Sequence, residues 1–135
     1  MERYAIVTPN APSSDGASSQ AIAHGGVLYV SSQLPIDPVT GVMLPRPIVR
    51  GTEAACRAQL LQGLANLRAV CEAAGAEMDD TLKLTFSTTV LAYSQVINSV
   101  CREIFPDVPP ARCIVGVSSL PGDAYVVVDA IVAIR

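Results

Sequence analysis

The spacing of apolar residues along the chain predicts two helices. Between Thr52 and Ala74, apolar side chains recur every three or four positions, which places them on one face of a helix. These inward residues are Cys56, Leu60, Leu64, Leu67, Cys71 and Ala74. Thr52 is a suitable N-cap and Gly75 a natural stop.

The same spacing predicts a second helix over Tyr93–Ile104, which the proline-rich stretch Pro106–Pro110 ends. Its predicted inward residues are Tyr93, Val96, Ile97, Val100 and Ile104.

Alternating apolar and polar residues predict a half-buried strand over Leu82–Val90. Its predicted inward residues are Leu82, Leu84, Phe86, Thr88 and Val90. The other predicted strands are Tyr4–Val7, Ser18–Ala23, Val27–Ser31, Arg112–Val117 and Tyr125–Ile134. The second and third of these flank a Gly-Gly turn and predict a β-hairpin. The last is almost entirely apolar, so it belongs inside the sheet. Four prolines predict that Leu34–Pro47 is a loop.

This order of elements predicts a single α+β domain over residues 1–135, with one mixed sheet and two helices on one face. The other face of the sheet would be bare in a monomer. Half of the residues are apolar and 16% are charged, against roughly 25% charged residues in ordinary domains. Because exposed apolar surface promotes aggregation, we expect several copies of the chain to cover that face.

Charge and composition argue against several classes of protein. The net charge is −3 and the nine basic residues are scattered, so a nucleic-acid partner is not expected. The four cysteines (Cys56, Cys71, Cys101 and Cys113) form no C-x-x-C pair and His24 is the only histidine, so no metal site is expected. No secretory signal or membrane-spanning run is present, which predicts a cytoplasmic protein without a membrane partner.

Four groups of residues, in chain order, resemble the motifs of the YjgF/RidA family, whose members are also described as L-PSP endoribonuclease-like. They are Asn10–Pro12 with Gln20-Ala21, then Leu28–Gly41, then the helix end Asn66–Gly75, and finally Pro110–Arg112, Leu120-Pro121 and Val128–Ile131. The second group is similar to the family's pattern of a hydrophobic residue followed by S-G-Q-x-P-x-D-P-x-T-G. The resemblance covers nearly the whole chain.

The resemblance implies a fold like that of bacterial chorismate mutase. It implies a homotrimer with a central barrel-like core and three clefts between subunits. It also implies hydrolysis of reactive enamines and imines, such as 2-aminoacrylate, to 2-oxo acids and ammonia, without a metal or organic cofactor. The expected small-molecule ligands are therefore imines and 2-oxo acids.

Arg112 is the principal candidate for substrate binding, because a guanidinium group grips a carboxylate through two hydrogen bonds. From spacing alone, a salt bridge explains Arg112 as well; the resemblance favours ligand binding. It also places Ser31, Ser32, Asn98 and Ile114 at family site positions. Two alternatives stay open: Ser31 either binds ligand or holds its loop, and Asn98 either binds ligand or faces solvent on the second helix.

The sequence departs from the family pattern at several site positions. Val127 stands where the family deaminases have a glutamate that positions water, and Ser18 replaces a tyrosine. Ser32 replaces a glycine that lies close to the ligand. Asp129, two residues beyond Val127, points to the same face of the strand; we weigh a catalytic role for it against pairing with an arginine across the trimer. Cys113 should face the other side of its strand from Arg112 and is either a reactive thiol or a packed residue.

Three other polar residues are predicted to be structural. Gln20 and Gln33 are expected to fix loops, and His24 to be a turn residue at a hairpin tip.

Two functions follow from these observations. The first is a hydrolytic deaminase of enamines and imines, on a non-standard substrate because of Val127. The alternative is a non-catalytic trimeric protein that binds small carboxylates such as 2-oxo acids, or that regulates a partner enzyme. The acidic pI and the scattered basic residues argue against ribonuclease activity.

Overall fold

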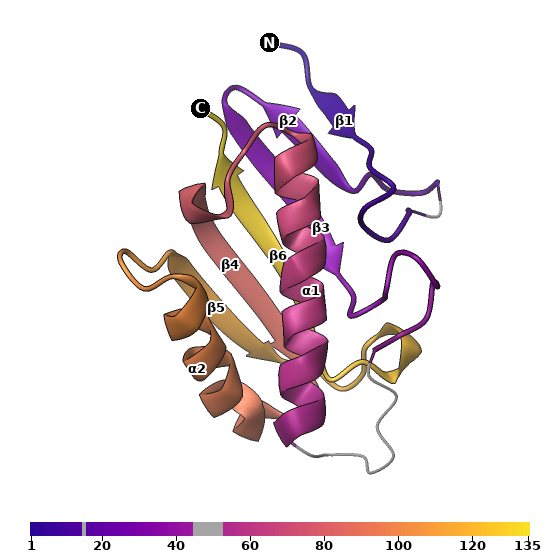
Figure 1. Cartoon of the computed structure of the whole chain (residues 1–135), viewed down its shortest axis with the longest axis vertical. Coiled ribbons are helices and arrows are strands. Elements are labelled where there is room, and N and C mark those ends of the chain that lie inside the picture. Colours follow the sequence, from indigo (N-terminus) through magenta and orange to yellow (C-terminus); the bar gives the residue numbers. More distant parts are fainter. Residues whose placement is uncertain (15, 45–52) are drawn as a thin grey trace.

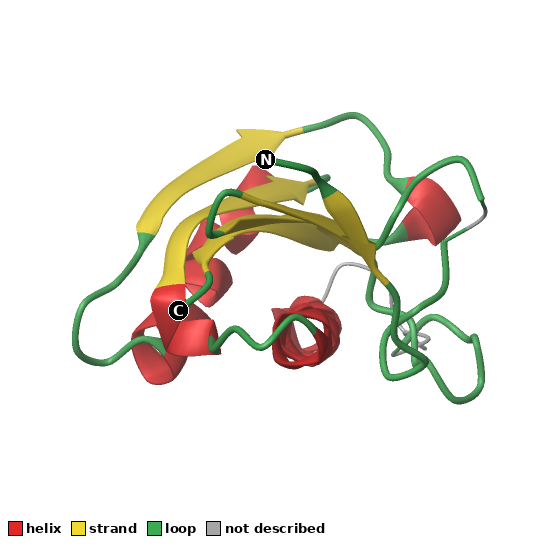
Figure 2. Cartoon of the chain, turned by 90° about the horizontal axis from the view of Figure 1, so that it is seen from above, coloured by secondary structure: helices red, strands yellow, loops and turns green. Residues whose placement is uncertain are grey.

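The computed structural model describes residues 1–14, 16–44 and 53–135. A six-stranded sheet forms one layer, and both helices cover the same face of it (Figures 1 and 2). The helices are α1 (Glu53–Ala73) and α2 (Ser94–Ile104). The strands are β1 (Tyr4–Ile6), β2 (Ala21–His24), β3 (Val27–Gln33), β4 (Thr81–Thr88), β5 (Ala111–Gly116) and β6 (Val126–Ala133). The prediction of an α+β fold with two helices on one face is confirmed.

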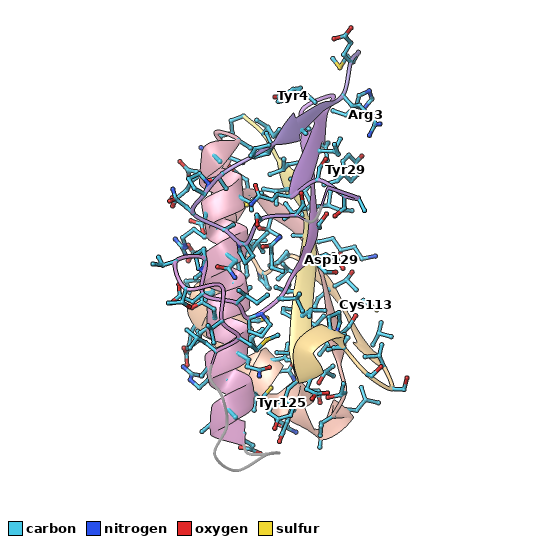
Figure 3. The ribbon with its side chains drawn as sticks, turned by 90° about the vertical axis from the view of Figure 1, so that its right-hand side faces the viewer. Arg3, Tyr4, Tyr29, Cys113, Tyr125 and Asp129 are labelled. Atoms are coloured by element: carbon cyan, nitrogen blue, oxygen red, sulfur yellow. The ribbon has the colours of Figure 1, made fainter. Side chains whose placement is uncertain are left out.

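The sheet order is β1-β2-β3-β6-β4-β5, with β4 and β5 parallel and the other neighbours antiparallel. Strand β6 lies inside the sheet, as its apolar sequence predicts, and Val126, Val128, Ala130 and Val132 are buried. The parallel pair is joined through α2, so β5 forms the sheet edge beside that helix (Figure 1). The face opposite the helices, here called the open face, carries Tyr29, Cys113 and Asp129 (Figure 3).

Helix α1 packs closely against the sheet through the residues that its periodicity predicts. Cys56, Leu60, Leu64, Leu67 and Cys71 are buried, while Ala74 lies just beyond the helix and is partly buried. The predicted N-cap, Thr52, lies outside the described residues. A Cβ atom added at Gly63 would lie 3.3 Å from the carbonyl oxygen of Gln33 and 3.6 Å from Val128. The missing side chain at Gly63 therefore permits a close approach of helix and sheet.

Two polar residues of α1 are also buried, which its apolar periodicity does not predict. The backbone N–H of Tyr125 donates to Gln59 Oε1 at 2.8 Å. The side-chain amide of Asn66 donates to the carbonyl oxygens of Leu34 and Ile36 at 3.0 and 2.9 Å. The helix thus satisfies backbone groups of two loops that no strand partner reaches.

The register of β4 corrects one prediction. Leu84, Phe86 and Thr88 are buried as expected, but Leu82 is 50% exposed and Thr81 is buried instead. The pairing with β6 shifts between Thr81 and Lys83, which is a β-bulge. One extra residue reverses the side-chain alternation, so at the start of the strand Leu82 faces away from the core and Thr81 faces into it. Val90, also predicted inward on this strand, lies beyond its end and is partly buried.

The second helix is confirmed with a short 3₁₀ turn before it. Tyr93 belongs to that turn (Leu91–Tyr93) and is buried together with Ile97 and Val100. Val96 and Ile104 are only partly buried. The N-terminal hairpin is also confirmed, and His24 is exposed at its tip, where Nε2 lies 3.2 Å from the carbonyl oxygen of Met1.

Gln20 fixes the loop before β2, as predicted. Its Oε1 accepts a hydrogen bond from the backbone N–H of Thr8 at 2.7 Å, and its Nε2 donates to the carbonyl oxygens of Thr8, Ala11 and Pro12. Gln33 is buried as well and donates to the carbonyl oxygen of Ser31 at 2.9 Å. Both glutamines therefore satisfy backbone groups rather than a ligand.

We expect Gln20→Ala to lower the free energy of unfolding by about 1–3 kcal/mol, because it strands buried backbone groups without partners. Chemical denaturation at one fixed protein concentration measures the change. The matched control is Gln95→Ala, on the exposed side of α2, which should change stability by less than about 0.5 kcal/mol. An equal effect of the two substitutions would contradict the role of Gln20.

Candidate functional site

A cavity of about 670 Å³ lies between α2 and the edge strand β5. Arg112 and Asn98 supply polar groups to it, while Leu84, Cys101 and Phe105 supply apolar surface. The chain reaches β5 through Pro109 and Pro110, which also line the cavity. An apolar hollow with a few convergent polar groups is the usual form of a small-molecule site.

Arg112 is the second residue of β5 and is held in place by its parallel pairing with Leu84 of β4. Leu84 is fully buried under the helices, so Arg112 lies on the helix side of the sheet. Among the residues that the structure describes, Arg112 forms no salt bridge. The salt bridge that spacing alone allowed is therefore not made with any of them, and the guanidinium remains able to bind an anion.

Asn98 projects from α2 into the same cavity. Its Oδ1 atom is buried and has no hydrogen-bond partner in the described part of the chain. A buried polar atom without a partner is uncommon in folded proteins and suits a position that a ligand completes. Of the two alternatives for Asn98, a ligand-binding position beside Arg112 agrees with this geometry better than a solvent-facing position on the second helix.

Cys101, one helical turn after Asn98, is a residue of this cavity that the sequence did not single out. Burial raises the pKa of its thiol, and the hydrogen bond and positive charge of Arg112 oppose that rise. Asn98 and Cys101 are three positions apart and so lie on the same face of α2. This spacing could have predicted from the sequence that Cys101 lies beside Asn98. Cys56 and Cys71 lie deeper, and burial raises the pKa of each thiol to about 11.

Ile114 does not line the Arg112 cavity. It pairs with Phe86, lies on the same side of β5 as Arg112, and packs against the core. Cys113 lies between these two residues, is exposed, and points to the open face as predicted (Figure 3). Within one chain, the structure therefore supports a packing role for Ile114.

Ser32 and Asp129 come together on the open face, away from Arg112. Ser32 Oγ donates to Asp129 Oδ2 at 3.4 Å, and Asp129 pairs with Thr85 of β4. Burial raises the pKa of the Asp129 carboxyl, and the hydrogen bond from Ser32 and the charge of Lys83 oppose that rise. Asp129 and Arg112 thus lie on opposite faces, so within one chain they cannot hold the same small ligand.

Val127 also points to the open face, since it pairs with Ser87, but it is buried. An aliphatic side chain there neither orients nor activates water.

Ser31 lies near the end of β3, where its Oγ donates to the carbonyl oxygen of Ser19 at 2.7 Å. Ser31 therefore holds the loop, and its oxygen can still accept a hydrogen bond. Ser31, Ser32 and Ser18 line a second cavity of about 240 Å³ near that loop.

The residues proposed from the resemblance therefore fall into two groups. Arg112 and Asn98 share the cavity beside α2, whereas Ser31, Ser32 and Asp129 lie toward the open face and the other side of the sheet.

No group of three or more His, Cys, Asp or Glu side chains that could hold a metal ion occurs among the described residues. In the same part of the chain, no helix is long and apolar enough to cross a membrane.

Comparison with known proteins assigns the chain to a family. The model of the family described as Endoribonuclease L-PSP matches residues 8–134. A RutC family protein from Pyrococcus horikoshii is 39% identical over 126 residues, which cover 93% of this chain and 94% of the relative. A 2-iminobutanoate/2-iminopropanoate deaminase from Dermatophagoides farinae is 36% identical over 130 residues, covering 96% of this chain and 95% of that protein.

Solved structures agree with this assignment. A Rid family protein of unknown function from Yersinia pestis superposes with a TM-score of 0.88 at 36% identity, covering 98% of this chain and all of the other. The YjgF protein of E. coli superposes with a TM-score of 0.83 at 30% identity, with coverage of 98% and 99%. The chain belongs to the YjgF/RidA family, and its mixed sheet with two helices is the chorismate mutase-like fold that the resemblance implies.

Proposed function

We propose that the protein is a hydrolytic deaminase that converts small enamines and 2-imino acids to 2-oxo acids and ammonia. One observation carries the proposal: the guanidinium of Arg112 lies in a partly apolar cavity without an ion-pair partner among the described residues. Such a group suits the carboxylate that every 2-imino acid carries. The relative from D. farinae, named for activity on 2-iminobutanoate and 2-iminopropanoate, supports the same class of substrate.

The chemistry asks little of the protein. Water adds to the carbon of the C=N bond, and the nitrogen takes up a proton. The resulting carbinolamine then loses ammonia and leaves the 2-oxo acid. In this scheme Arg112 holds the carboxylate, Asn98 hydrogen-bonds the ligand beside it, and the cavity keeps the imine carbon near water. General acid–base assistance adds roughly 10²–10⁴-fold to such a reaction, so loss of a family glutamate at Val127 slows turnover without abolishing it.

The proposed active site lies between copies of the chain. Arg112 and Asp129 lie on opposite faces of one sheet, so only a neighbouring copy can bring Asp129, Ser31 and Ser32 toward a ligand held by Arg112. The open face presents exposed apolar side chains, among them Tyr29 and Val115. Covering that face in a homotrimer would bury them and complete the site. Asp129 would then either assist the attacking water or pair with an arginine of the next subunit.

We therefore expect the protein to be a trimer in solution. Native mass spectrometry and light scattering at micromolar concentration should both give three times the mass of one chain. The exposed Cys113 provides an independent check, because its thiol should react with a maleimide far more slowly in the assembled protein than in a dissociated one. A stable monomer with full activity would contradict an active site between subunits.

A second function rests on a different observation. Val127 is buried and apolar, and no aspartate or glutamate lines the Arg112 cavity among the described residues, so one chain supplies no evident base for water beside Arg112. A protein with the Arg112 cavity but no such base would bind small carboxylates such as 2-oxo acids without turnover. It would act as a sensor or as a regulator of a partner enzyme.

Ammonia release separates the two functions. Freshly generated 2-aminoacrylate and a series of larger imino acids should release ammonia faster with the protein than without it. The 2-oxo acid products should raise the melting temperature in a parallel assay, because a ligand that binds only the folded state stabilises it. Thermal stabilisation without turnover of any imine would favour the binding protein. If the protein shows neither ammonia release nor thermal stabilisation, both proposed functions are wrong.

A further inference from the structure

A third cavity, of about 340 Å³, lies near the N-terminus on the same side as Tyr29. Arg3 and Tyr29 line it together with the hydroxyl-bearing residues Ser18, Ser19 and Ser31. Figure 3 shows Arg3 and Tyr29 extending from the sheet on its open side. This cavity, here called the Arg3 cavity, contains an arginine that the family resemblance does not account for.

The chemistry of the Arg3 cavity suits an anion. No aspartate or glutamate occurs among its described lining residues, and Arg3 forms no salt bridge with any residue that the structure describes. The phenol of Tyr29 and the hydroxyls of Ser18 and Ser19 can donate hydrogen bonds beside the guanidinium, whereas the Ser31 hydroxyl already donates to the carbonyl oxygen of Ser19. An arginine beside several hydroxyl donors, with no acidic side chain among the described lining residues, is a typical setting for a carboxylate.

The position of the Arg3 cavity connects it with the proposed substrate site. Ser18 and Ser31 line both the Arg3 cavity and the adjoining cavity that contains Ser32. Arg112 lies on β5, at the opposite edge of the sheet from β1, which follows Arg3 directly. One small ligand can therefore contact both arginines only where β5 of one copy meets Ser18 and Ser31 of another.

We infer that the substrate is a dicarboxylic 2-imino acid, with the carboxylate next to the imine held by Arg112 and the distal carboxylate held in the Arg3 cavity of a neighbouring copy. This inference rests on the proposed function, since it concerns the ligand of the same site. It adds a specificity-determining residue, Arg3, that selects acidic substrates over those with short apolar side chains.

The test is calorimetric titration of the full-length protein with 2-oxobutanoate, which has one carboxylate, and 2-oxoglutarate, which has two. Arg3→Ala should weaken binding of 2-oxoglutarate roughly ten- to a hundredfold, as expected for loss of a hydrogen bond to a charged group, and leave 2-oxobutanoate within about twofold. Arg3→Lys should give a smaller loss, because it keeps the charge without the fork. The control is Arg68→Ala, on the exposed side of α1, which removes the same charge elsewhere and should affect neither ligand.

Three results would overturn the inference: no effect of Arg3→Ala on either ligand, an equal loss of both, or unchanged binding of 2-oxoglutarate in Arg112→Ala. The third would mean that the Arg3 cavity binds anions by itself, and a titration with inorganic phosphate would then give the same Arg3-dependent signal. Failure of the proposed function looks different. In that case binding of 2-oxoglutarate depends on Arg3 and Arg112, yet neither monocarboxylic nor dicarboxylic imino acids release ammonia.

Discussion

Replacing Arg112 with alanine should lower affinity for 2-oxo acids, and kcat/KM for imine hydrolysis, by about 10²–10³-fold. The physical reason is the loss of a two-point, charge-assisted contact with the carboxylate, since each hydrogen bond to a charged group contributes about 1.5–3 kcal/mol. The side chain is exposed and forms no salt bridge with the described residues, so its removal breaks no ion pair among them and loses, within the chain, the hydrogen bond with the weakly polar Cys101 thiol. Steady-state ammonia release and calorimetric titration measure the two effects.

The controls separate the contact from charge and from folding. Arg112→Lys keeps the charge but loses the planar fork, so its loss should be smaller than that of alanine. Arg68→Ala removes an arginine from the exposed side of α1 and should leave both measurements unchanged. The native mass and melting temperature of Arg112→Ala should match those of the unaltered protein. Unchanged ligand affinity in a well-folded Arg112→Ala protein would remove the basis of the proposed site.

The second large effect is on stability. Phe86 lies in the middle of β4, is fully buried beneath the helices, and pairs with Ile114 of β5 and Val128 of β6. Phe86→Ala should lower the free energy of unfolding by about 3–5 kcal/mol, through lost burial and the cavity left behind. Equilibrium denaturation with urea measures the change, at one fixed protein concentration because the stability of the proposed trimer would depend on concentration.

The matched control truncates a residue on the outer side of the helical layer. Leu61 is 40% exposed on α1, so Leu61→Ala should cost less than about 1 kcal/mol. Similar losses for the two substitutions would mean that the sheet core is not centred on β4 and β6. A loss of Phe86→Ala below about 1 kcal/mol would contradict its position in the core directly.

Local sequence patterns predicted the elements because their physical causes are local. The apolar spacing of Leu60, Leu64 and Leu67 can be satisfied only by a helix with one buried face. The continuous apolar run of β6 requires cover on both sides, and the strand lies inside the sheet. Where a non-local factor intervened, the pattern failed. The bulge in β4 that exposes Leu82 depends on pairing with β6, which lies some fifty positions further along the chain.

The candidate site divides in the same way. Motif resemblance identified Arg112 and Asn98, but only the packing of α2 beside β5 shows that the two share a cavity. The resemblance could not show that Ile114 is a packing residue, or that Cys101 lines the cavity, because both facts depend on how the helix crosses the strand. Arg3 has no motif around it, and its association with Ser18 and Ser31 exists only in the folded chain.

By itself, then, the sequence determined the fold class, the family and the arginine best suited to a carboxylate, since these follow from periodicity and from residues adjacent along the chain. The tertiary structure alone decided which side chains face one another. It placed Arg112 and Asp129 on opposite faces of the sheet and Arg3 at the far edge from Arg112. The reason is that strand pairing fixes the face on which each side chain lies, and pairing partners are chosen by contacts between residues distant in sequence.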